Sequence, residues 1–190
     1  MSRDRKQHLT DPSAMRALAH PLRLRLLGEL RVAGPHTVGM LSDRFDEAPG
    51  NVSYHLAVLA RHGFVVEVPE RARDKRERWW AASHEVTSWE PVEALAEPEL
   101  QSASTELRRA ILDRYAETLT DYLDAEPQLD REWVTGTASS DSNLHLTPAE
   151  LQELRAELEA LSSRWNARSD AGRPGAELVT LIYHAFRRTR

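Results

Sequence analysis

The sequence has no cysteine among its 190 residues, which excludes disulfide bonds, thiolate metal sites and cysteine nucleophiles. No apolar run approaches the roughly 20 residues needed to cross a bilayer, so we expect no membrane partner. The charged first ten residues lack the apolar core of a signal peptide, which favours a cytoplasmic location.

Glycine is also scarce, with eight residues, and none lies in a strand-to-helix phosphate turn. The motifs G-x-S-x-G, H-E-x-x-H, the P-loop and the dinucleotide fingerprint are missing as well. We therefore expect no enzyme, no catalytic residue and no cofactor.

The net charge of −5 would argue against a nucleic-acid partner, but it is unevenly distributed. Residues 1–84 carry 14 Lys and Arg against 10 Asp and Glu, a net charge of +4. Residues 85–190 carry 11 against 20, a net charge of −9. This asymmetry predicts a basic module joined to an acidic one.

The first half predicts four helices and a hairpin. Asp11-Pro12 and Pro21 open helices that end near residue 19 and before Gly34-Pro35, and leucines recur at helical spacing in the second of them. A short helix over 38–45, a bend at 46–49 and a helix over 49–62 follow. Residues 64–68 and 78–82 are strand-like and flank a polar tip.

The spacing over 38–62 predicts a helix-turn-helix, whose second helix places side chains in the DNA major groove. If Val52, Leu56 and Leu59 face the core, a polar set lies on or beside the outer face: Gly50, Asn51, Ser53, Tyr54, His55 and Arg61. We expect His20 to have a structural role. For His55 two roles stay open, contact with DNA and support of its helix. The hairpin tip carries five cations that can meet phosphates as a wing, Arg71, Arg73, Lys75, Arg76 and Arg78.

The runs ALAHPLRLRLLGEL (17–30) and NVSYHLAVLARHGFV (51–65), with the Arg-rich hairpin, resemble ArsR-type winged-helix transcriptional regulators. The resemblance covers about residues 12–84 and implies a homodimer that binds an inverted-repeat operator and represses transcription. It also implies that Asn51, Ser53, Tyr54 and His55 are recognition-helix positions. The cysteine pair of the family's metal sensors is absent, and 99–124 holds no histidine for its other metal site.

The second half predicts a long amphipathic helix over 99–124, similar to the family's dimerisation helix, and an acidic α/β region. Within that region we expect a strand at 132–137, a helix opened by the capping box at Thr147 and a covered strand at 177–186. The fold class is thus α+β and mostly helical. Its predicted parts are a winged helix-turn-helix domain at 10–84, a junction at 85–98 and a dimerisation and acidic region at 99–190.

Two alternatives stay open for the function. In one, His145 and His184 meet nearby carboxylates and the protein is a metal-responsive regulator, although no fixed ligand spacing supports a metal site. In the other, the winged helix is an adaptor for protein contacts. Trp133 and Trp165 have two possible roles: they line a pocket for a small-molecule effector, or they belong to a plain hydrophobic core.

Overall fold

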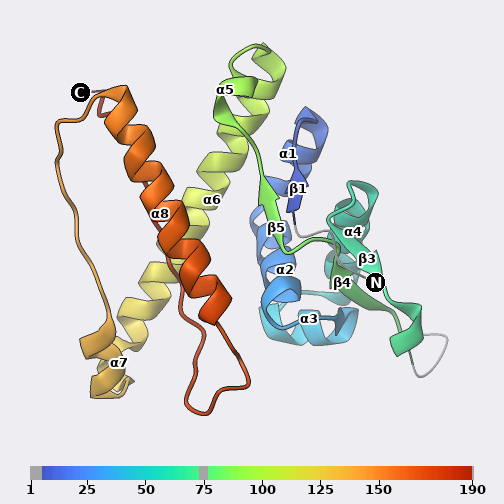
Figure 1. Cartoon of the computed structure of the whole chain (residues 1–190). Coiled ribbons are helices and arrows are strands. Elements are labelled where there is room, and N and C mark those ends of the chain that lie inside the picture. Colours follow the sequence, from blue (N-terminus) through green and yellow to red (C-terminus); the bar gives the residue numbers. More distant parts are fainter. Residues whose placement is uncertain (1–5, 73–76, 190) are drawn as a thin grey trace. The chain divides into compact units, whose positions relative to one another are not determined.

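The computed structural model describes residues 6–72 and 77–189, and the chain divides into two compact units, Met1–Ala125 and Glu126–Arg190. The first unit begins with four helices, α1 (Pro12–Leu18), α2 (Pro21–Val32), α3 (Val38–Phe45) and α4 (Pro49–Arg61). All four predicted helices are confirmed (Figure 1).

Side-chain caps explain where three of these helices begin. The Asp11 carboxylate accepts a hydrogen bond from the Ser13 amide, and His20 Nδ1 accepts one from the Leu22 amide at 3.2 Å. Thr37 Oγ1 accepts one from the Met40 amide. Each cap satisfies an amide that the first helical turn leaves without an intrahelical partner, and the predicted structural role of His20 is confirmed.

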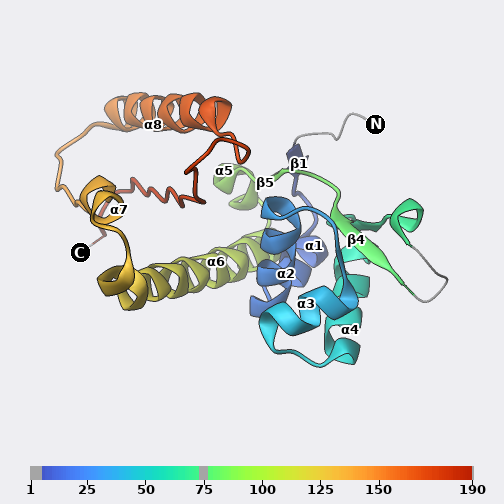
Figure 2. The ribbon, with the colours of Figure 1, turned by 90° about the horizontal axis from the view of Figure 1, so that it is seen from below.

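A three-stranded antiparallel sheet follows the helices. Strand β4 (Trp79–Ala82) lies between β3 (Val65–Glu67) and β2 (His36–Thr37), and Val65 pairs with Ala82. The predicted hairpin is therefore confirmed, and it extends away from the helices (Figure 2). The 3-10 helix η1 (Pro69–Arg71) begins its tip.

Three short elements were not predicted because two or three residues are too few for a visible alternation. They are β2 itself and the parallel pair formed by β1 (Lys6–His8) and β5 (Val86–Ser88). Residues 85–98, the predicted junction, hold β5 and α5 (Pro91–Ala94), and Ala94 joins the core of the first unit. The exact extent of the DNA-binding domain stays a prediction.

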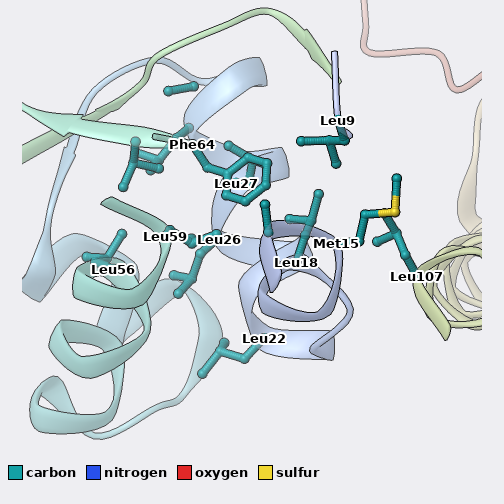
Figure 3. Packing of buried hydrophobic residues seen from close by; sticks show 14 of the residues in the cluster. Leu9, Met15, Leu18, Leu22, Leu26, Leu27, Leu56, Leu59, Phe64 and Leu107 are labelled. Atoms are coloured by element: carbon teal, nitrogen blue, oxygen red, sulfur yellow. The ribbon is translucent and has the colours of Figure 1, made fainter. Parts of the chain in front are cut away.

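One apolar core holds the first unit together (Figure 3). Leu26 of α2, Leu41 of α3 and Leu56 of α4 are fully buried, with Phe64 between α4 and β3. The predicted long helix is confirmed as α6 (Pro98–Ala125). Its first turns join the core through Leu100, Ala103 and Leu107, and Leu107 lies near Met15 of α1.

The second unit contains η2 (Glu126–Gln128), α7 (Arg131–Gly136) and α8 (Pro148–Arg168). The predicted capping box is confirmed, because Thr147 and Glu150 exchange hydrogen bonds at the start of α8. Half-buried leucines of the predicted seam, Leu151, Leu154, Leu158 and Leu161, lie on this helix.

Two strand predictions in this unit are wrong. Residues 132–137 are mostly helical, because their alternation was weak and Asp130 takes the N-cap position of α7. Residues 177–186 are exposed and form neither helix nor strand. A strand needs a neighbouring backbone, and no strand is found in residues 126–189, so the described part of the C-terminal region is helical rather than α/β.

Candidate nucleic-acid interface

The turn between α3 and α4 fixes how the two helices meet. Asp46 ends α3 in the left-handed conformation, with φ of 52°, and its amide donates to the Ser42 carbonyl. The buried Ser42 hydroxyl donates to the Glu47 carbonyl, and the Glu47 amide donates to the Ser42 carbonyl at 3.1 Å. These bonds hold a three-residue turn of the kind that a helix-turn-helix requires.

Helix α4 has one buried and one exposed side. Val52, Leu56 and Leu59 are fully buried, as predicted. A stripe at steps of three and four residues faces solvent on the other side, comprising Asn51, Tyr54, Ala57 and Arg61, with Gly50 beside it. Tyr54 is 62% exposed although it is large and aromatic, and Ser53 is half-buried at the edge of the stripe.

Glu47 is a neighbour of this stripe that sequence reasoning missed. Its carboxylate accepts a hydrogen bond from the Asn51 side-chain amide at 2.7 Å. The sequence signal for this contact was the spacing of four residues between Glu47 and Asn51, because residues so spaced are neighbours on a helix. The bond orients the Asn51 side-chain amide. If Asn51 contacts DNA, its amide gives up the hydrogen bond to Glu47 and forms one to a base edge instead.

His55 lies beside the outer face rather than on it, and of its two predicted roles its burial favours support of the helix over DNA contact. Its side chain is 6% exposed, and its ring lies 4.4 Å from that of His20 and 5.1 Å from that of Tyr54. Burial, followed by the nearby His20 and Arg23, lowers the pKa of His55. His55 therefore supports the exposed Tyr54 from beneath, because it occupies the boundary between the two faces and α2 covers it.

Arg23 connects the end of α1 to this histidine pair. Its Nε donates to the Ala17 carbonyl and its Nη2 to the Arg16 carbonyl at 3.5 Å, while Nη1 lies 3.4 Å from His55 Nδ1. A guanidinium at the end of a helix satisfies carbonyls that have no intrahelical partner. Burial lowers the pKa of Arg23.

The described residues of the hairpin place two predicted cations in specific contacts. Arg78 forms a two-pronged ion pair with Glu67 across the strands, at 3.0 and 2.9 Å, and lies 5.0 Å from the Trp80 ring. The Arg78 hydrogen bonds lower the pKa of Glu67. Arg71 lies 5.8 Å from the Trp79 ring. The other three predicted wing cations, Arg73, Lys75 and Arg76, lie outside the described residues.

The candidate metal ligands His145 and His184 belong to no metal-binding cluster among the described residues. In residues 6–72 and 77–189, no group of three or more histidine, aspartate or glutamate side chains could hold a metal ion. Trp133 and Trp165, the candidate effector residues, are both exposed. A search of the described helices finds none that is long and apolar enough to span a membrane.

A family model described as a helix-turn-helix domain matches residues 18–68. The match includes α2, α3, α4 and β3, and therefore the turn and the exposed stripe. No curated protein matches the chain.

Three solved structures are similar to the chain. Reduced HlyU from Vibrio cholerae is 24% identical, covers 51% of this chain and 83% of its own, and has a TM-score of 0.32. The apo form of a ZitR mutant from Lactococcus lactis is 14% identical and covers 77% and 83%, with a TM-score of 0.33. The transcriptional regulator Tm0710 from Thermotoga maritima is 13% identical and covers 80% and 81%, with a TM-score of 0.32.

These TM-scores are below 0.5, so the assignment rests on the matched domain and on the geometry of the turn, α4 and the hairpin. A helix that follows a short fixed turn and exposes a polar stripe, beside a basic hairpin, is the arrangement by which such domains contact DNA. The chain therefore contains a helix-turn-helix domain, and this domain and its geometry support a role in DNA-binding transcription regulation.

Proposed function

We propose that the chain is an ArsR-type repressor that binds an inverted-repeat operator as a homodimer. The observation that carries this proposal is the exposed stripe of α4, whose opposite face is fully buried in the core. A rigid helix holds its outward side chains in one geometry, and direct readout of base edges requires such precision.

Within this proposal, α4 lies in the major groove. Asn51, Tyr54 and Arg61 contact base edges or the adjacent backbone, and Ser53 contributes from the edge of the stripe. A Cβ at Gly50 would meet no atom within 4 Å, so the surface there is open to a close approach by the DNA backbone. Arg71 and Arg78 contact phosphates, together with the predicted Arg73, Lys75 and Arg76 of the hairpin tip.

The proposed dimer forms through the second half of α6. Beyond Leu107 the helix exposes apolar side chains at steps of four, three and four residues, namely Leu112, Ala116, Leu119 and Leu123. This spacing is that of a helix seam that packs on a second helix. Two-fold symmetry then sets two copies of α4 about one turn of DNA apart, roughly 34–36 Å.

The test is selection of genomic fragments that the purified protein retains at about 150 mM salt, a concentration that suppresses binding through phosphates alone. We expect an enriched inverted repeat with half-site centres about 10 base pairs apart, or a multiple of that spacing. The enriched site should overlap a promoter whose reporter rises when the protein is deleted. Enrichment of fragments without a shared motif would contradict the proposal, and binding without any salt dependence would favour the adaptor alternative.

A further inference from the structure

The second unit has no hydrophobic core of its own. None of the described residues from 126 to 189 is buried, and six large apolar side chains lie exposed within 178–186 alone. Leu178 is 73% exposed, Val179 70% and Phe186 74%. Soluble proteins rarely leave such a continuous apolar segment in water, so this one is expected to be covered.

The same segment has the composition of a strand but no strand partner. Residues 177–186 (ELVTLIYHAF) are rich in β-branched and aromatic residues, and their trace is extended (Figure 2). Tyr183 and Ala185 line a groove of about 500 Å³ with Leu151 and Leu158 of α8. Arg188 donates to the Asn143 side chain at 3.3 Å. The segment is thus held beside α8, yet it pairs with no strand in the described part of the chain.

We propose that residues 177–187 pair with the same residues of a second copy of this chain, as two antiparallel strands related by a two-fold axis at Ile182. This surface is separate from the α6 seam and does not depend on DNA binding. It gives the second unit the neighbouring backbone and the apolar cover that it lacks within one chain.

The sequence of the segment selects this partner and this register. With Ile182 opposite itself, Glu177 faces Arg187 of the second copy at both ends of the ladder. Between them Leu178 faces Phe186, Val179 faces Ala185, Thr180 faces His184 and Leu181 faces Tyr183. Each position thus faces one of like polarity or opposite charge, which stabilises antiparallel pairs.

Neighbouring registers lose part of this match. A shift of one position in one direction places Glu177 against Phe186. In the other direction Glu177 still faces an arginine, Arg188, but Leu178 then faces Arg187 and Leu181 faces His184. Two-residue shifts place Glu177 against Ala185 or Val179 against Arg187. Charge complementarity together with the match of apolar positions therefore favours a second copy with Ile182 at the axis.

Because the chain contains no cysteine, one introduced cysteine tests the register directly. In Ile182→Cys the two thiols face each other, with Cα atoms about 4.5–5.5 Å apart, a separation that a disulfide spans. In the control Leu178→Cys the two thiols lie eight residues apart along the ladder, about 27 Å. We expect at least tenfold more covalent dimer for Ile182→Cys after mild oxidation of dilute protein, and recovery of cross-linking in Leu178→Cys/Phe186→Cys.

A charge exchange tests the partner independently. Glu177→Arg and Arg187→Glu should each raise the dissociation constant of the self-association roughly 2- to 30-fold, as expected for two exposed cross-strand pairs. A mixture of the two variants should associate as tightly as the wild type, because each strand then faces the opposite charge. Equal cross-linking at 178 and 182, no cross-linking of folded Ile182→Cys, or no recovery in the mixture would overturn the proposal. The last two results would favour a contact within one chain or a different protein as the partner.

Discussion

The Glu67–Arg78 ion pair predicts that one substitution strengthens DNA binding. In the free protein the Arg78 guanidinium is held by both carboxylate oxygens of Glu67, at 3.0 and 2.9 Å. A guanidinium in this pair cannot give the same donors to a phosphate, and the carboxylate repels phosphates as well. Glu67→Gln removes the competing charge while it keeps the shape of the side chain.

The size of the effect follows from the exposure of the pair. Both side chains are partly exposed, 56% for Arg78 and 36% for Glu67, so the pair stabilises the hairpin by about 0.2–1 kcal/mol. If Arg78 must leave this ion pair to contact a phosphate, removing the pair by Glu67→Gln raises DNA affinity about 1.4- to 5-fold per wing. One additional phosphate contact steepens the slope of log affinity against log salt concentration by about 0.9. Between 50 and 200 mM salt, the affinity then falls by roughly 3.5-fold more than in the wild type.

Fluorescence anisotropy with labelled DNA over a salt series measures both quantities. Glu70→Gln is the matched control, because Glu70 is an exposed carboxylate of the same hairpin outside this pair. It reports the general effect of one less negative charge. Glu67→Gln in an Arg78→Gln background should show no gain beyond that control. Weaker binding by Glu67→Gln, or a gain that survives without Arg78, would refute the reasoning.

Three further predictions concern stability and the open surface at α4. Leu107→Ala leaves a cavity in the core and should lower the free energy of unfolding by about 2–5 kcal/mol in urea, whereas Leu95→Ala, at an exposed position outside the α6 seam, should change it by less than about 0.5 kcal/mol. Gly50→Ala should keep or increase helix stability, by up to about 1 kcal/mol, but weaken DNA binding at constant fold. Burial lowers the pKa of His20 and His55 below the ordinary value of 6.5, so the unfolded chain takes up protons first as the pH falls. Urea titrations should then show stability falling as the pH is lowered below about 6.5, and a flat profile between pH 7 and 5.5 would contradict this.

Most of the first unit could be predicted from local signals. Asp11-Pro12 and Pro21 mark helix starts, and the leucine spacing marks the buried faces. Gly63, with φ of 74°, follows the end of α4. These signals act within a few residues of one another, so the sequence shows them without knowledge of the fold.

The details of the site could not be predicted in the same way. His55 lies at the boundary between two helix faces, and only the approach of His20 and Arg23 from α2 decides that it is buried. The Glu67–Arg78 pair depends on the register of two strands across a ten-residue tip. Both facts belong to tertiary structure, where residues distant in sequence meet.

The second unit shows a different limit. The β-rich composition of 177–186 predicted a covered strand, but strand formation requires a partner backbone that one chain does not supply among its described residues. The amino-acid pattern was informative about propensity and could not indicate where a partner comes from. The proposed pairing with a second copy reconciles the composition with the structure.

The most direct test of the central claim, that the exposed stripe of α4 reads DNA sequence, is the ratio of affinities for the selected operator and for random DNA. Tyr54→Ala removes the most exposed aromatic side chain of the stripe, and we expect the ratio to fall by about 1–3 kcal/mol, roughly 5- to 160-fold. Val92→Ala, which removes an even more exposed apolar side chain from α5, should leave the ratio unchanged. An unaltered ratio in folded Tyr54→Ala and in Asn51→Ala would contradict the account.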